Sequence, residues 1–318
     1  MDWTRSALPD LTGCRAVVTG ANSGLGYATT AALAEAGAHV VMVCRDQARG
    51  DAAKERLNDD APAATLSVVS IDLAVRDSII EGADRLKQDG ESIDILVNNA
   101  GVMGIPYREA MGGIEYQFAV NHLGHFCLTG LLLESLSLDA RVVSVSSGMH
   151  RRGSPEWPVP GRKEDYHRWR AYANSKLANI LFAYELDRRF EKASIDAMSV
   201  AAHPGYADTP LQQKSAAGSR IRSIVMRVAN TLFAQSSEKG ALPILFAATD
   251  PTVEGREFYG PGGLFNMRGS PEKQSPISIA EDEDIALHLW EQSEMWTGIT
   301  YAVEDLKAIV EPPAMTTQ

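Results

Sequence analysis

The sequence has little of three things: cysteine, positive charge and long apolar runs. Three of its 318 residues are cysteines, and because no two of them have CxxC spacing, neither a zinc site nor a disulfide framework is indicated. The 41 acidic residues outnumber 30 lysines and arginines, and the net charge of −11 disfavours binding to nucleic acid or to an anionic membrane surface. No run of about 18 apolar residues exists that would span a membrane, and the N-terminus lacks the apolar core of a signal peptide or anchor.

What remains is an ordinary globular composition. Hydrophobic residues make up 45% of the chain and charged residues 22%, which is enough for a large core. The few, widely separated cysteines favour a reducing, cytoplasmic location. Because no linker divides the chain, we expect a single domain over 1–318, with 261–318 as a C-terminal extension.

Short apolar runs alternate with helix-like stretches along the chain. The runs are apolar without alternation, which is typical of parallel strands covered on both faces. Strands separated by such long crossovers predict an α/β fold, a doubly wound parallel sheet of the Rossmann type with helices on both faces. The expected strands lie at 14–19, 39–44, 66–71, 93–98, 141–146, 195–200 and 257–260. The expected helices lie at 25–36, 46–58, 75–88, 114–135, 172–191, 237–249 and 283–295.

Two segments do not fit this alternation. Residues 148–171 are rich in proline, glycine, arginine and tryptophan, which predicts an irregular loop. Residues 206–236 carry apolar side chains at helical spacing, interleaved with arginines. Because they follow a strand at the edge where such sheets bind ligands, we expect them to form a lid that selects an apolar substrate. A helix docked permanently on the core is the alternative.

A glycine-rich turn, TGANSGLG, follows the first expected strand. Gly20, Gly24 and Gly26 would let the backbone turn sharply and approach a pyrophosphate, to which the next helix offers free N–H groups. A strand–turn–helix without a ligand is the alternative. The same turn contributes Asn22, Ser23 and Leu25 to the expected cofactor site.

The end of the second strand bears on the choice between NAD and NADP. An acidic residue there usually holds a free ribose 2′-hydroxyl, whereas a 2′-phosphate needs a cation. Here Cys44 is followed by Arg45, which favours NADP(H); the alternative is a solvated Arg45 with Asp46 in the acidic role. Asp72, beside Leu73 after the third strand, either hydrogen-bonds the adenine amino group or caps the next turn.

The sequence contains one Tyr-x-x-x-Lys motif, formed by Tyr172 and Lys176. On a helix these two positions share a face. An ammonium close to a phenol stabilises the phenolate, which suits Tyr172 to acid–base catalysis.

The order of the motifs resembles that of the short-chain dehydrogenase/reductase family over residues 12–265. Stretches such as NNAGVM, VNHLGHF and AYANSKLANILF are similar to the retinol-dehydrogenase-like branch. The resemblance implies an NADP-dependent oxidoreductase that interconverts an alcohol and a carbonyl on an apolar small molecule. The alternatives are a carbon–carbon double-bond reductase, because the branch is also similar to protochlorophyllide reductase, and a non-catalytic dinucleotide sensor.

The resemblance also implies a role for each matching position. Tyr172 would be the general acid in reduction and the general base in oxidation, and Lys176 would lower its pKa and hold the nicotinamide ribose. Ser147, with Ser146 as the alternative, would hydrogen-bond the substrate oxygen. Asn121 would hold a helix distortion and a water that relays protons to Lys176. The positions expected along the cofactor are Asn99, Ala100, Gly101, Pro204, Gly205 and Thr209.

The histidines need separate interpretation. His122 and His125 would need further ligands to bind a metal, and because the sequence nominates none, we expect no metal but packing and hydrogen bonding at a helix start. His150 either reaches the active site or makes a loop hydrogen bond. The expected partners are a small apolar substrate and no nucleic acid, with a homo-oligomer as one alternative for the assembly.

Overall fold

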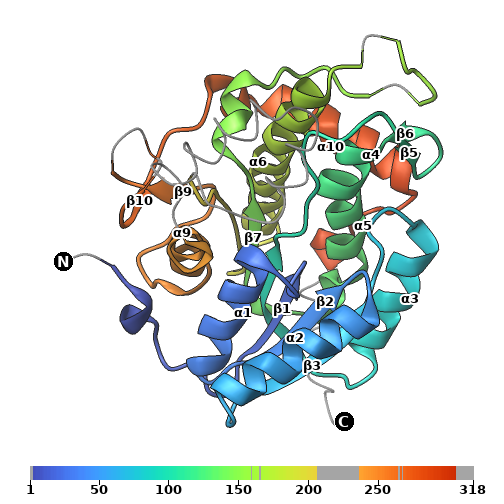
Figure 1. The fold of residues 1–318 in the computed structure, drawn as a ribbon. Helices are drawn as coiled ribbons and strands as arrows, with labels where there is room; N and C mark the ends of the chain where they lie inside the picture. The colour runs from blue at the N-terminus through green and yellow to red at the C-terminus, as the bar shows by residue number, and fades with distance from the viewer. Residues whose placement is uncertain are drawn as a thin grey trace, which may run out of the picture.

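A mostly parallel eight-stranded sheet forms the centre of the molecule (Figure 1). The computed structural model describes residues 3–158, 160–164, 166–205, 236–263, 266 and 268–305. Within them the strand order is β10-β9-β8-β7-β4-β1-β2-β3, and β10 alone runs antiparallel to its neighbour. The predicted doubly wound, single-domain fold is thus confirmed. The strands of this sheet are β1 Arg15–Thr19, β2 His39–Cys44, β3 Thr65–Ser70, β4 Ile93–Asn98, β7 Leu136–Val145, β8 Met198–Ala202, β9 Phe258–Pro261 and β10 Pro271–Lys273.

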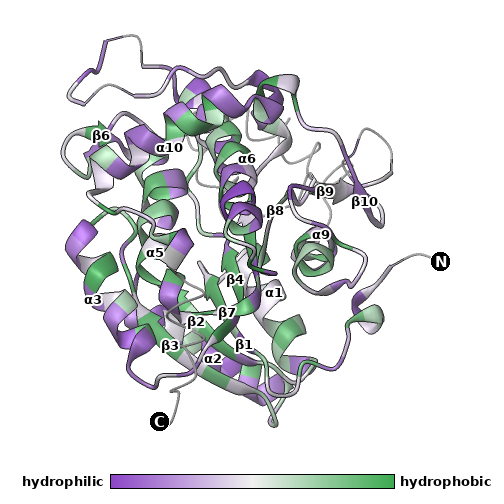
Figure 2. Cartoon of the chain, turned by 180° about the vertical axis from the view of Figure 1, so that it is seen from behind, coloured by the Kyte–Doolittle hydropathy of each residue, from purple (hydrophilic) through white to green (hydrophobic). Residues whose placement is uncertain are grey.

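Helices cover both faces of the sheet. On one face, α1 Gly24–Glu35, α2 Gln47–Asp60 and α9 Ser237–Thr249 share one apolar cluster with the strands. On the other face, a second cluster includes α3 Arg76–Lys87, α5 Gly124–Leu131 and α6 Arg168–Lys192, joined by α10 Glu283–Thr297 through Trp290. Figure 2 shows the central strands mainly in the hydrophobic colour, as expected for strands covered on both faces. No helix among the described residues is both long enough and apolar enough to cross a bilayer.

The expected helix at 114–135 is interrupted. The chain there forms the end of a small hairpin, β5 Glu109–Ala110 with β6 Ile114–Glu115, followed by the short helix α4 Tyr116–Phe118. A π-helical turn, Ala119–Leu123, then leads into α5. Because apolar residues continue through all of these elements, the sequence pattern did not mark the boundaries.

Three other boundaries differ from the prediction. The strand expected at 195–200 begins at Met198, because Ser194 takes a left-handed φ of 56° and the amide of Ile195 bonds back to Phe190, which ends α6. Strand β7 begins at Leu136, five residues before the expected start. The expected loop at 148–171 contains a 3-10 helix, Gly148–Arg152, and the first turn of α6.

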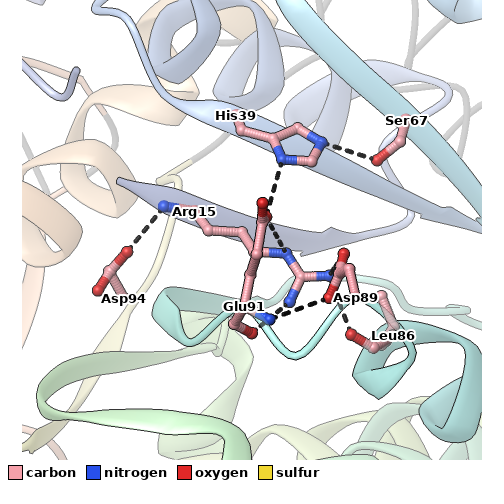
Figure 3. A network of polar contacts seen from close by, with 7 residues as sticks. All are labelled: Arg15, His39, Ser67, Leu86, Asp89, Glu91 and Asp94. Carbon is pink, nitrogen blue, oxygen red and sulfur yellow. Dashed lines mark hydrogen bonds and ion pairs between the residues drawn. The ribbon is translucent and has the colours of Figure 1, made fainter. Parts of the chain in front are cut away.

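A buried arginine ties the strands together at the end of the sheet opposite the glycine-rich turn (Figure 3). Arg15, the first residue of β1, is 4% exposed. Its guanidinium donates to the Leu86 carbonyl at 2.9 Å, to the Glu91 carbonyl at 2.7 Å and to Asp89 at 2.8 Å. Glu91 also lies 3.6 Å from Nδ1 of His39, the first residue of β2. This network joins the start of two strands to the loop between α3 and β4.

Candidate active site

The predicted site residues meet where the strand order reverses. Strands β1 and β4 are neighbours, and from them the chain continues in opposite directions across the sheet. In such sheets the crevice outside the carboxyl ends of these strands binds the ligand. The residues that follow β1, β4, β7 and β8, beginning with Gly20, Asn99, Ser146 and His203, are brought to this edge.

The glycine-rich turn has the geometry of a phosphate cradle. Gly20 and Gly24 have φ values of 69° and 56°, in the left-handed region that favours glycine. A Cβ on Gly26 would lie 2.3 Å from the Gly20 carbonyl oxygen. Ser23 is the N-cap of α1, and its side chain makes no capping hydrogen bond, so the first amides of the helix remain available to an anion. Asn22 and Leu25 lie in the same turn, partly exposed. These residues fit a dinucleotide pyrophosphate.

The residues at the ends of β2 and β3 are those for which the sequence left two roles open, cofactor binding or a local structural contact. Arg45 is exposed, and Asp46 accepts a hydrogen bond from the Arg49 amide at 3.1 Å as the N-cap of α2. Asp72 accepts a hydrogen bond from the Ala74 amide at 2.9 Å, so one of its oxygens caps the turn. The Leu73 side chain is buried in the core and can face a cofactor only through its backbone.

The turn after β4 is fixed to β1. Asn99 Nδ2 donates to the Thr19 carbonyl at 2.7 Å, and the amides of Asn99 and Ala100 both donate to the Thr19 hydroxyl at 2.9 Å. A Cβ on Gly101 would lie 3.6 Å from Lys176 Nζ, which places this turn against α6. Asn99, Ala100 and Gly101 thus lie between the glycine-rich turn and α6.

Tyr172 and Ser147 form the centre of the site. The Ser147 side chain lies close to the Tyr172 phenol, and Tyr172 is 6% exposed. Burial raises the pKa of Tyr172 above its usual value, while the nearby Ser147 hydroxyl lowers it. Ser146, the alternative partner, instead donates to the backbone carbonyl of Lys176 at 2.7 Å. The geometry therefore places Ser147 at the phenol.

Lys176 is on the same face of α6, one turn after Tyr172. Its Nζ lies 5.9 Å from the centre of the Tyr172 ring and donates to the Val145 carbonyl at 2.9 Å. Burial lowers the pKa of this lysine to about 8. The effect of the ammonium on the pKa of Tyr172, which the resemblance implies, stays a prediction.

Asn121 lies in the π-helical turn, a helix distortion of the kind implied for it. Its side chain accepts from the Val102 amide at 2.7 Å and donates to the Val102 carbonyl at 2.9 Å. The same Nδ2 donates to Ser175 at 3.0 Å, and Ser175 donates to the Tyr172 carbonyl at 2.8 Å. Asn121 therefore connects the loop after β4 with α6.

The histidines are held by hydrogen bonds within the core. His122 Nε2 lies 2.9 Å from Ser293, and His125 bonds to Thr19 and to the Asn121 carbonyl. His150 bonds to the Ser147 carbonyl at 2.7 Å, which makes it a loop contact next to the site. The described part of the chain contains no group of three potential metal ligands.

One residue beside the site was not singled out in the sequence analysis. Buried Gln117 accepts from the Gly104 amide at 2.7 Å and donates to the Tyr166 hydroxyl at 2.8 Å and the Arg168 carbonyl at 2.9 Å. It thus holds the loop after β4 against the start of α6. The pattern YQF does not indicate that its glutamine is buried like the aromatic residues on either side of it.

The remaining predicted positions follow β8 along the chain. Pro204 and Gly205 follow β8 at the site edge, with a Gly205 φ of 67°. Thr209 and the predicted lid, apart from Ser236, lie outside the described residues.

Comparisons with known proteins agree with this arrangement. The family model described as short chain dehydrogenase matches residues 15–220. Retinol dehydrogenase 14 of Mus musculus is 37% identical over 295 residues, which cover 89% of this chain and 85% of that protein. Retinol dehydrogenase 13 of Homo sapiens is 34% identical over 290 residues, covering 89% and 84%.

Two solved structures are also similar. An uncharacterised protein from Mycobacterium paratuberculosis is 36% identical with a TM-score of 0.78, over 95% of this chain and 99% of that chain. A structure from Beutenbergia cavernae, described as an NAD(P)-dependent gluconate 5-dehydrogenase with bound NADP, is 25% identical with a TM-score of 0.58, over 76% and 91%.

Proposed function

Because this chain belongs to the short-chain dehydrogenase family and is an oxidoreductase that interconverts alcohols and carbonyl compounds, we propose three finer properties for it. Tyr172 transfers the proton, the cofactor is NADP(H), and the substrate is an apolar small molecule. The observation that carries the proposal is the placement of Ser147 close to Tyr172, at the crevice edge of the sheet and on the face of α6 that bears Lys176.

A bound nicotinamide would provide the hydride chemistry of the reaction, and this chain's own residues would hold and transfer the proton. Ser147 hydrogen-bonds the substrate oxygen beside the Tyr172 hydroxyl. Burial raises the pKa of Tyr172, so the phenol is protonated at neutral pH and can donate to a carbonyl oxygen as reduction proceeds. Lys176 and Asn121 hold the surrounding loop and helix in place through their backbone contacts.

The role of Tyr172 is tested by Tyr172→Phe. We expect kcat to fall by about 10² or more, the usual contribution of a general acid, while the fold and cofactor affinity are retained. Tyr184→Phe is the matched control, because Tyr184 is equally buried on the same helix but lies 12 residues after Tyr172. Near-wild-type turnover by folded Tyr172→Phe would exclude the assignment.

The preference for NADP(H) is supported by the end of β2. Arg45 is exposed there and available to a 2′-phosphate, and the competing acidic residue, Asp46, is engaged as a helix cap. Asp46 also lies 4.0 Å from Arg49 Nε, which adds a second cation to this corner. The NADP bound to the similar protein from Beutenbergia cavernae is in keeping with the proposal.

Arg45→Ala tests this preference. We expect it to weaken NADPH binding by about 1.5–3 kcal/mol, the scale of a charge-assisted hydrogen bond, and to leave NADH binding little changed. Arg56→Ala, an exposed arginine on α2 that stacks on Tyr27, is the control. The preference would be wrong if calorimetric titration of the wild-type protein gave a tighter Kd for NADH than for NADPH.

The proposal of an apolar substrate is supported by partly exposed apolar side chains on α6 and on the loop after β4. Trp169 lies one turn before Tyr172 on α6, and a Cβ on Gly104 would lie 3.0 Å from its ring. Between Gly101 and Gly104 the loop presents Val102 and Met103, both partly exposed. An apolar carbonyl compound would therefore meet apolar surface next to the proton donor.

A substrate panel with NADPH tests this last property. Retinoids, steroids and long-chain aldehydes should be reduced with higher kcat/KM than small polar ketones, measured as loss of NADPH absorbance. The products should be alcohols, whereas saturation of a conjugated double bond would favour the alternative reductase.

We also propose a reducing, cytoplasmic location, which the free thiols of Cys14, Cys44 and Cys127 support.

A further inference from the structure

His125, near the start of α5, lies behind the active site and is 2% exposed. Its Nε2 is 2.9 Å from the Thr19 hydroxyl at the end of β1. Its Nδ1 is 3.0 Å from the backbone carbonyl of Asn121 in the π-helical turn. One side chain therefore touches both the strand that leads into the glycine-rich turn and the residue that supports the catalytic helix.

The direction of each hydrogen bond follows from the chemistry of the partners. A carbonyl oxygen can only accept, so Nδ1 of His125 carries the hydrogen. Burial lowers the pKa of His125 to about 4, so the ring is neutral at pH 7 and its Nε2 is an acceptor. The Thr19 hydroxyl must then donate its hydrogen to His125.

This direction matters for the turn after β4. A hydroxyl has one hydrogen and two acceptor positions. With its hydrogen directed at His125, Thr19 accepts from both the Asn99 and the Ala100 amides, each at 2.9 Å. The other acceptor within reach of the hydrogen is the Val97 carbonyl, at a longer 3.3 Å. His125 thus sets the hydroxyl orientation that holds two consecutive amides of the turn.

The second contact of His125 reaches the other side of the same loop. The carbonyl it binds belongs to Asn121, whose side chain holds both backbone groups of Val102 and bonds to Ser175. The segment 99–102 is therefore fixed at one end through Thr19 and at the other through Asn121. His125 is the group common to both ends.

We propose that His125 is a positioning residue for the cofactor, which holds the segment 99–102 in its binding conformation before the dinucleotide arrives. It does so through Thr19, and it touches neither cofactor nor substrate. The proposal rests on the proposed function, because the segment matters for binding only if the crevice takes a dinucleotide.

The test is a double-mutant cycle between His125→Phe and Thr19→Val, with two measurements. The first is the Kd for NADPH, from quenching of tryptophan fluorescence. The second is amide hydrogen exchange of residues 99–102 in the cofactor-free protein. We expect His125→Phe to raise the Kd about tenfold, in line with the loss of one buried hydrogen bond, and to speed exchange in the segment. In the Thr19→Val background the same change should alter the Kd by less than about twofold, because the two residues act together.

One conservative variant and one matched control test whether the contact of His125 with Thr19 is responsible. His125→Gln keeps an acceptor that can reach Thr19 and should restore most of the affinity. If the phenylalanine variant does not fold, His125→Leu, which also lacks the acceptor, replaces it in the cycle. His122→Phe is the matched control: this histidine is equally buried, but it bonds to Ser293 on α10. It should leave exchange of 99–102 as in the wild type.

Two results would overturn the proposal. One is that folded His125→Phe has the same Kd for NADPH and the same hydrogen exchange in 99–102 as the wild type. The other is that the fold-changes in Kd of the two single variants multiply in the double variant, as they would for independent residues. Failure of the proposed function looks different. If the wild-type protein bound neither NADPH nor NADH, exchange in the cofactor-free protein would still report whether His125 holds the segment.

Discussion

Buried histidines make the stability of this protein sensitive to acid, and His150 gives the sharpest test. Its ring is 1% exposed. Nδ1 bonds to the Ser147 carbonyl at 2.7 Å and so carries the hydrogen, while Nε2 accepts from the Ile277 amide at 3.3 Å. If Nε2 were protonated, its N–H would face the N–H of the Ile277 amide, and two donors cannot form a hydrogen bond. Accordingly, burial lowers the pKa of His150 from 6.5 to about 4.

The sign and size of the effect follow from linkage. The unfolded chain takes up this proton near pH 6.5, whereas the folded protein does so only near pH 4. Stability is therefore fully present above pH 6.5 and is lost as the pH falls through this window. Between pH 7 and pH 5, His150 alone accounts for a loss of about 2 kcal/mol in the free energy of unfolding.

The assay is urea denaturation of wild type and His150→Gln at pH 7 and at pH 5, followed by circular dichroism. Glutamine does not titrate, so the loss between the two pH values should be smaller in the variant by about 2 kcal/mol. This difference is independent of any constant destabilisation caused by the substitution. His288→Gln, an exposed position on α10, should behave as the wild type. Equal losses in His150→Gln and wild type would refute the reasoning.

Two further predictions concern the opposite ends of β1. Gly26→Ala should raise the Kd for NADPH at least about tenfold in calorimetry, because the new Cβ would lie 2.3 Å from the Gly20 carbonyl oxygen and 2.6 Å from Asn99 Nδ2; an unchanged Kd would contradict the cradle. Arg15→Met should lower the free energy of unfolding by about 3–5 kcal/mol, because it leaves buried acceptors without a partner, yet leave kcat of the folded fraction unchanged. Loss of kcat in that fraction would show that the network reaches the active site.

The sequence predicted the fold well because parallel strands leave a strong signal. Runs such as HVVMVC are apolar at every position after the first, and the structure buries all of those residues, while the initial histidine is half-buried. The glycine-rich turn is equally readable, since only glycine tolerates both the φ of Gly20 and the close approach at Gly26. The strands and motifs together determine which edge of the sheet holds the site.

The connections behind the site are not readable in the same way. His125 and Thr19 are separated by 106 residues, and Gln117 joins segments that lie 13 and about 50 residues away. The π-helical turn at Asn121 changes a backbone hydrogen-bonding pattern without changing the apolar periodicity. Such features depend on tertiary partners, so a pattern within one segment does not contain them.

In the proposed mechanism, the protonation states of Tyr172 and Lys176 decide which direction of the reaction the site favours. Reduction of a carbonyl needs a protonated phenol, and burial already favours that form of Tyr172 by raising its pKa. Oxidation of an alcohol needs the phenolate, which would have to be stabilised by the nearby ammonium. Lys176 retains its proton at neutral pH, with a pKa of about 8, but directs it at the Val145 carbonyl. The resting arrangement is therefore that of a proton donor, and the oxidative direction requires Lys176 to exchange the carbonyl for a contact that favours the phenolate.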